Sequence, residues 1–137
     1  GSRDFTDLWT LASFLEGVRG SCGGDLRVIH GAARGTDRLA GVWAEAAPGV
    51  TVEPFPADWK THFPAWCAGD CPGSLRRENP YCSLAGFVRN QRMLDEGKPE
   101  LVVAFVNKPL SQSKGSADMV NRAIAARVGY VVVESHR

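Results

Sequence analysis

A glycine-rich turn carries the residue types best suited to chemistry in this chain: His30-Gly31-Ala32-Ala33-Arg34-Gly35-Thr36-Asp37. It follows a short apolar run at 27–29 and precedes an amphipathic segment, which predicts a strand that turns directly into a helix. The first turn of a helix carries unpaired backbone N–H groups and a partial positive charge, and both bind phosphate. The same pattern also occurs where a strand and a helix merely need a tight connection.

Two further turns repeat this arrangement. Gly1-Ser2-Arg3-Asp4 precedes the apolar-periodic stretch 6–18, and Lys114-Gly115-Ser116-Ala117-Asp118 joins the apolar run 101–105 to the stretch 119–128. If the three turns lie on the same side of one sheet, they form one site. We therefore expect the backbone N–H groups at 31–36 and 115–117 to bind phosphate groups.

The elements that position these turns alternate along the chain. Helices are predicted at about 6–18, 36–46, 86–96 and 115–128, and strands at 27–30, 50–55, 101–106 and 130–134. The strands are apolar throughout, which is typical of strands that are buried on both faces. The pattern predicts a Rossmann-like three-layer α/β domain with a parallel sheet, whose ligands bind at the carboxyl ends of the strands.

The strand that should lead into Gly1 is not among the residues given. Gly1-Ser2 is either a cloning remnant or the true turn after that first strand. In both cases a sheet without this strand exposes an edge, which invites pairing with another chain. We expect a homo-oligomer, in the simplest case a dimer.

Length and composition set the broad class. The 137 residues suit a single domain over 1–137, and 44% hydrophobic and 23% charged residues are ordinary for a globular protein. Because no apolar run approaches about 18 residues, no membrane partner is expected, and a cytoplasmic location is the default. The formal net charge of +1 gives no reason to expect DNA binding.

An inserted loop at 58–85 holds most of the cysteines. His62, Cys67, Cys71 and Cys82 lie within 21 residues of a proline-containing stretch with little apolar periodicity. A long irregular segment needs something to hold it, and in a reducing compartment a structural zinc ion is favoured over a disulfide. A disulfide and unpaired thiols stay open as alternatives, and Asp58 or Asp70 could replace His62. No redox cofactor is expected.

Four ordered motifs resemble a known family. They are Gly-Ser-Arg-Asp-Phe at 1–5, His-Gly-x-Ala-x-Gly-x-Asp at 30–37, Gly-Phe-x-Arg-Asn-x-x-Met at 86–93 and Gly-Ser-Ala-Asp-Met at 115–119. Together they look like the YspA-like, cpYpsA-related branch of the SLOG superfamily, a Rossmann-like group that includes the DNA-processing protein A and the LOG phosphoribohydrolases. The resemblance implies an actinobacterial or phage source.

The resemblance also implies a pocket for a nucleotide-derived small molecule, such as a nucleoside phosphate or ADP-ribose, in a sensor or sequestering protein. Arg89 and Asn90 lie in a segment similar to the Arg-Lys-x-x-Met motif, whose arginine holds a nucleoside monophosphate in the LOG enzymes. Arg3 and Arg89 would supply charge, and Asp37, Asn90 and Asp118 would supply polar selection. The expected ligand-binding residues are Gly1, Ser2, Arg3, His30, Gly31, Gly35, Thr36, Asp37, Arg89, Asn90, Gly115, Ser116 and Asp118.

Catalysis is the point where this chain departs from the LOG pattern. Met119 stands where the phosphoribohydrolases carry a catalytic glutamate. This favours binding over cleavage of an N-glycosidic bond, with Arg89 and Asp118 as the candidates if the chain is an enzyme. A phosphoribohydrolase and a DNA-processing module are the alternative functions. Asp118 could instead pair with Arg122, and His30 could be a purely structural histidine.

Overall fold

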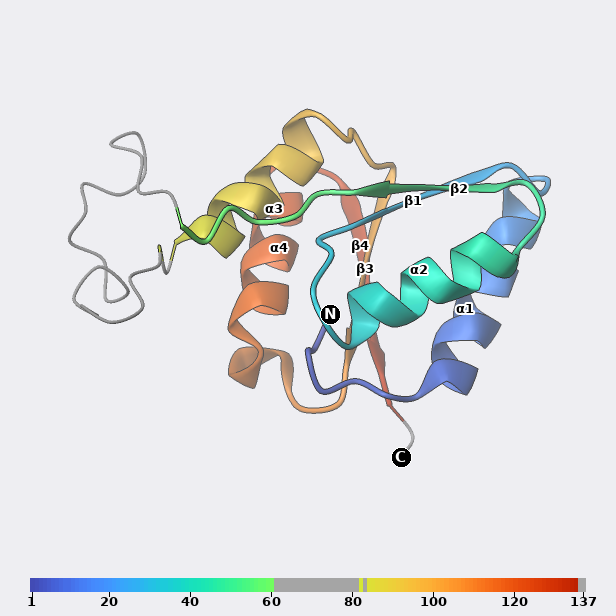
Figure 1. Cartoon of the computed structure of the whole chain (residues 1–137), viewed down its shortest axis with the longest axis horizontal. Coiled ribbons are helices and arrows are strands. Elements are labelled where there is room, and N and C mark those ends of the chain that lie inside the picture. Colours follow the sequence, from blue (N-terminus) through green and yellow to red (C-terminus); the bar gives the residue numbers. More distant parts are fainter. Residues whose placement is uncertain (61–81, 83, 136–137) are drawn as a thin grey trace.

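The computed structural model describes residues 1–60, 82 and 84–135, in which helices and strands alternate along the chain (Figure 1). The elements are, in order, α1 (Leu8–Ser21), β1 (Leu26–His30), α2 (Thr36–Ala46), β2 (Val50–Pro54), α3 (Ala85–Asp95), β3 (Leu101–Val106), the 3₁₀ turn η2 (Leu110–Gln112), α4 (Lys114–Ala125) and β4 (Gly129–Glu134). The predicted mixed α/β composition is confirmed, and each predicted helix and strand is present.

The predicted boundaries differ from the observed ones mainly at helix ends. α1 begins at Leu8 instead of residue 6 because Asp7 caps it: the Asp7 carboxylate accepts hydrogen bonds from the Thr10 backbone N–H (3.1 Å) and hydroxyl (2.6 Å). The helix then runs to Ser21, and the chain leaves it through Gly23, which has a positive φ. The 3₁₀ turn before α4 was not predicted, because a single turn has too few residues to show a period.

The expectation of one parallel sheet is not met by the described residues. They form two separate parallel pairs: β1 pairs with β2 from Leu26↔Val50 to His30↔Pro54, and β3 pairs with β4 from Leu101↔Gly129 to Val106↔Glu134. The parallel direction of each pair was predicted correctly. The pairs stay separate because no described strand lies between β1 and β3.

Helices cover the strand pairs in two groups. α1 packs on α2, and α3 packs on α4, with the two groups on opposite sides of β3 and β4 (Figure 1). Between α1, α2 and the strands lies the main core, where the Phe105 ring meets Phe5 (centroids 5.7 Å apart) and Phe14 (5.8 Å apart). Phe105 thus ties the end of β3 to the start of the chain.

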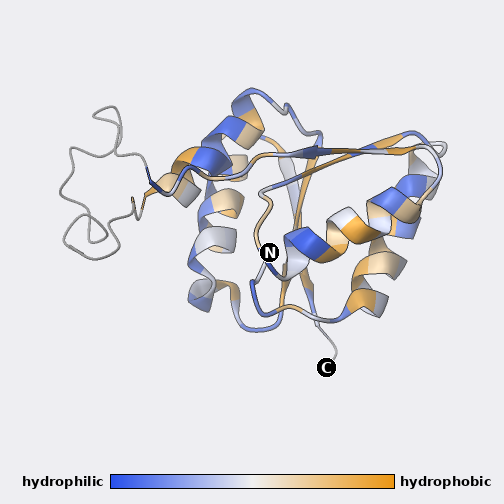
Figure 2. Ribbon diagram, in the orientation of Figure 1, coloured by the Kyte–Doolittle hydropathy of each residue, from blue (hydrophilic) through white to orange (hydrophobic). Residues whose placement is uncertain are grey.

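A second apolar cluster lies beneath α3 and α4 and contains Leu94, Val102 and Ala123. Figure 2 shows hydrophobic residues along the strands and both hydrophobic and hydrophilic residues in the helices, as expected of helices that cover strands with one face. Among the residues described, no helix combines the length and the apolar character needed to cross a bilayer.

The ends of the Cys-rich insertion lie close together. The backbone N–H of Cys82 donates to the carbonyl of Trp59 (2.5 Å), and the fully buried Cys82 packs with Ala85 at the start of α3. Most of the predicted loop at 58–85 lies outside the described residues. That it is an insertion within one domain stays a prediction.

Candidate functional site

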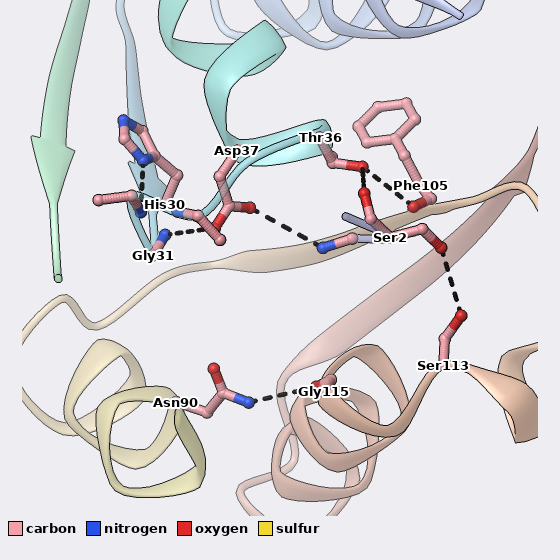
Figure 3. A network of polar contacts seen from close by, with 12 residues as sticks. Ser2, His30, Gly31, Thr36, Asp37, Asn90, Phe105, Ser113 and Gly115 are labelled. Atoms are coloured by element: carbon pink, nitrogen blue, oxygen red, sulfur yellow. Dashed lines mark hydrogen bonds and ion pairs between the residues drawn. The ribbon is translucent and has the colours of Figure 1, made fainter. Parts of the chain in front are cut away.

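The predicted turns border one cavity of about 610 Å³. Its lining includes the start of the chain, the turn after β1 and the first turns of α2 and α4. Figure 3 shows these segments converging, with Asp37, Thr36 and Ser2 on one side and Asn90 and Gly115 on the other. Nine of the thirteen predicted ligand-binding residues line the cavity: Gly1, His30, Gly31, Thr36, Asp37, Arg89, Asn90, Gly115 and Ser116.

The remaining four predicted residues, which are Ser2, Arg3, Gly35 and Asp118, do not line it. The Ser2 hydroxyl is buried and lies 3.2 Å from the Ser113 hydroxyl. The Arg3 guanidinium lies over the Trp59 ring, 5.4 Å from its centroid. These side chains hold segments around the cavity instead of facing into it.

Asp37 organises the glycine turn after β1. Its carboxylate accepts hydrogen bonds from the backbone N–H groups of Gly31 (3.0 Å) and Ala33 (3.2 Å). The amino group of Gly1 lies 3.9 Å from the other carboxylate oxygen. Two of the N–H groups expected to bind phosphate therefore already donate to Asp37.

His30 and Thr36 complete the turn from its two ends. His30 Nδ1 accepts the N–H of Ala32 (3.0 Å), which is the structural role left open by the sequence. The Thr36 hydroxyl contacts the carbonyl oxygens of Ser2 (3.1 Å) and Phe105 (3.2 Å), and the Thr36 N–H donates to Ser2 (3.2 Å). Within the described residues, the N–H groups of Arg34 and Gly35 are the two in this turn that make no hydrogen bond.

Arg89 brings a positive charge to the cavity from the first half of α3. Its Nη1 donates to the Gly31 carbonyl and to the Phe55 carbonyl (3.4 Å), and its Nε donates to Asn90 Oδ1 (3.1 Å). Burial lowers the pKa of Arg89 and is opposed by the nearby Asp37 carboxylate, while Arg3 lowers it further. A guanidinium remains charged at neutral pH nevertheless, because its ordinary pKa is so high.

Gly31 has no side chain for a reason that concerns Arg89. A Cβ atom there would lie 2.5 Å from the Arg89 Cζ atom, so the guanidinium would have to move away from the turn. The glycine lets the guanidinium lie flat against the turn. The motif glycine and the motif arginine, 58 positions apart, are thus in direct contact.

Asp118 lies in a network beside the cavity. Its carboxylate accepts hydrogen bonds from Asn90 Nδ2 (3.0 Å) and Arg122 Nε (2.8 Å), and Asn90 also donates to the Gly115 carbonyl (3.2 Å). The alternative of an ion pair with Arg122 is therefore confirmed. Asp118 positions Asn90, and Met119 contributes to the cavity wall.

The amino-terminal end of α4 offers donors at the cavity. Ser113 precedes the helix but makes no side-chain cap, because its hydroxyl lies against Ser2. The N–H of Ala117 donates to the Ser113 carbonyl (2.8 Å), whereas the N–H groups of Gly115 and Ser116 donate to no other residue in the described part of the chain. Both residues line the cavity, so their N–H groups and the helix dipole are available to an anion.

The amino group of Gly1 lies at the same end of the cavity as Arg89 and Asp37. Burial lowers its pKa below the ordinary value, Asp37 raises it and Arg89 lowers it. Gly1 nevertheless keeps exposed surface, since it borders the cavity. The group is thus poorly hydrated and faces an open space.

Sequence reasoning missed residues that act through their backbone or through packing. The Phe105 carbonyl receives both the Ser2 N–H (2.8 Å) and the Thr36 hydroxyl, and Ser113 holds Ser2. The position of Ser113 just before a predicted helix was an available signal. A carbonyl at the end of a strand gives no signal in the sequence, because every residue has one.

The predicted zinc site lies largely outside the described residues, which include Cys82 but not His62, Cys67 or Cys71. The described part of the chain contains no group of three metal-ligating side chains. The metal content of the purified protein therefore tests the zinc prediction.

We expect purified protein to contain about one zinc ion per chain, because four Cys and His ligands make a closed tetrahedral site. Elemental analysis measures this directly. Cys67→Ser and Cys71→Ser should each lose the metal, whereas Cys22→Ser, which changes the cysteine outside the loop, should keep it. Retention of zinc in both loop variants, or a disulfide in peptide maps, would contradict the prediction.

The comparisons with known proteins bear on the first part of the chain. Residues 1–62 match the family model described as YspA, cpYpsA-related SLOG family. This range contains the motifs at 1–5 and 30–37, while those at 86–93 and 115–119 lie beyond it. No curated protein and no solved structure matched the chain. Residues 1–62, which are less than half of the 137-residue chain, are thus similar to the YspA, cpYpsA-related SLOG family.

Proposed function

We propose that this protein binds a nucleotide or a nucleotide-derived ligand, such as a nucleoside phosphate or ADP-ribose, at the carboxyl ends of β1 and β3. The observation that carries the proposal is the convergence of Arg89 with the uncapped amino-terminal end of α4 on one cavity. SLOG similarity over residues 1–62 supports a nucleotide-related ligand at a coarse level.

The phosphate contacts follow from the donors at this end of the cavity. The N–H groups of Gly115 and Ser116 and the charge of Arg89 are complementary to a phosphate. The turn at 31–36 contributes less than the sequence suggested, because Asp37 already uses two of its N–H groups. A carboxylate repels phosphate, so Asp37 is better suited to a ribose hydroxyl or an amine.

The state of the acidic side chains near the phosphate donors favours ligand binding over hydrolysis. Asp118 is engaged by Asn90 and Arg122 and does not line the cavity, while Met119 has no titratable group. Asp37 lines the cavity, but its carboxylate accepts two backbone N–H groups. The proposal therefore describes a ligand-binding protein, not a phosphoribohydrolase.

Native mass spectrometry with AMP, ADP and ADP-ribose tests the proposal. We expect at least one of them to bind at a ratio of one per chain and to be released intact, because Asp37, the acid beside Arg89, already accepts two backbone N–H groups. Titration calorimetry then gives the affinity. A matched incubation with adenosine, which lacks phosphate, should show at least tenfold weaker binding.

Three results would count against the proposal in different ways. Release of a base together with a ribose phosphate would mean that the protein is an enzyme. No binding of any of the three nucleotides would leave the glycine turns as connections only. Strongly salt-dependent binding of DNA, by contrast, would support the nucleic-acid alternative.

A further inference from the structure

The cavity extends far beyond the phosphate donors at its polar end. It is lined by every residue of β1 and by Leu101–Phe105 of β3, from the amino-terminal to the carboxyl ends of both strands. Its volume of about 610 Å³ corresponds to roughly 20 water molecules, whereas protein interiors contain few voids larger than one. A nucleotide at one end does not account for the remaining length.

Apolar side chains from the helices line this part of the cavity, while the charged lining residues Asp25, Lys98 and Glu100 precede β1 or β3 in the chain. Leu15 and Val18 of α1 lie on one side, and Met93 of α3 and Met119 of α4 lie on the other. Helices thus cover both faces of the space, and strands border its two edges. This is the environment of a strand inside a three-layer α/β domain, where both faces are buried and the sequence is apolar.

The strands that border the cavity have unpaired edges. In the described chain, β1 pairs with β2 and β3 with β4, and neither pairs with a second described strand. Their other edges therefore present rows of backbone N–H and C=O groups toward the cavity. Backbone groups between two layers of helices are almost always paired in folded proteins, so a strand is missing between β1 and β3.

Gly1 and Ser2 lie at the carboxyl end of the gap between β1 and β3. The Ser2 N–H donates to the carbonyl of Phe105 (2.8 Å), which is the last residue but one of β3. A Cβ atom on Gly1 would lie 2.6 Å from the Phe105 carbonyl oxygen, so the backbone at Gly1 runs directly against the strand. Gly1 itself lines the cavity, and chain extended backward from its nitrogen would enter the gap.

We propose that the gap between β1 and β3 is a slot for an extended apolar segment of about five or six residues, joined to Gly1 by a peptide bond. The segment runs parallel to both strands and unites them in one sheet, in the order β2, β1, segment, β3, β4. This is the order of doubly wound folds, and the connection from the segment through α1 to β1 is the usual crossover.

A segment joined to Gly1 fits this gap better than a small molecule or a strand from a second copy of the chain. An apolar small molecule could fill the volume but could not pair with two rows of backbone groups. A strand from a second copy could pair with both edges, but it would have to end beside Gly1 without being joined to it. Attachment to Gly1 also turns a poorly hydrated amino group into a neutral peptide group.

The test adds six residues before Gly1. One version carries alternating valine and isoleucine, a second carries alternating valine and threonine to limit aggregation, and the matched control has proline at two central positions of the second version. Proline removes backbone donors and cannot continue a central strand. Hydrogen exchange of individual amides in β1 and β3 is followed by NMR, and native mass spectrometry gives the oligomeric state.

We expect the strand-forming extensions to slow exchange about a hundredfold at alternate amides of β1 and β3, because successive N–H groups point to opposite edges of a strand. Amides that already pair with β2 or β4 should change less, the proteins should be monomeric, and the proline control should match the parent chain. Equal exchange in the valine–threonine version and its proline control would overturn the proposal. Protection that appears only in a dimer would overturn it in favour of a second copy.

Discussion

Gly35→Ala is expected to lower the free energy of unfolding by about 3 kcal/mol, and with it the melting temperature by about 10 °C. Gly35 has φ 76° and ψ −124° at the start of α2, a conformation that residues with a side chain rarely adopt. A Cβ atom there would also lie 2.5 Å from the Ser2 carbonyl oxygen and would contact Arg3, both through backbone atoms. Backbone atoms cannot rotate away, so the turn itself must move.

Thermal and urea unfolding measure this effect, and the chain supplies a matched control. Gly17 is exposed within α1, and a Cβ atom there would meet nothing within 4 Å. Gly17→Ala should therefore be neutral or stabilise the protein by about 0.5–1 kcal/mol. If both variants unfolded like the parent chain, the close approach of the turn to Ser2 and Arg3 would be wrong.

Arg89→Ala is expected to weaken the binding of AMP, ADP or ADP-ribose by about 10- to 100-fold, because hydrogen bonds to charged groups contribute roughly 1.5–3 kcal/mol. Arg89 lines the cavity together with the proposed phosphate donors Gly115 and Ser116. It lies against Gly31 and beside Asn90. Titration calorimetry at fixed salt concentration measures the loss. Arg89→Lys keeps the charge but not the planar fork, so it should restore part of the affinity.

Arg92, one turn later on α3, is the matched control. It pairs with Glu96 (2.8 Å), lies 5.7 Å from the Phe55 ring centroid and does not line the cavity. Arg92→Ala should therefore change the affinity less than twofold. Equal losses in the two variants would indicate a general electrostatic effect of helix α3, and the site would not be the one proposed.

The sequence determined most of the secondary structure. Apolar strands such as Leu101–Val106 and the amphipathic stretch at Thr36–Ala46 were predicted within a residue or two, because hydrophobic periodicity and glycine turns are local signals. Local signals also identified most of the site. Gly31, Arg89 and Gly115 belong to predicted motifs, and all three line one cavity.

The tertiary structure decided which predicted groups are available. Asp37 and Asp118 were both expected to face a ligand, yet Asp37 binds the N–H groups of its own turn and Asp118 holds Asn90 and Arg122. Residue type alone does not distinguish these roles, since a carboxylate accepts hydrogen bonds equally well from a ligand and from the backbone.

The pairing of the strands was likewise decided by the tertiary structure. Alternating helices and strands predict a parallel sheet, but whether β1 and β3 become neighbours depends on what lies between them. In the described residues they are separated by an apolar cavity whose carboxyl end is bordered by Gly1. The sequence by itself thus determined the elements and the motif residues through local periodicity, whereas the long-range backbone contacts of Gly1, Ser2 and Phe105 decided the shape of the space they enclose.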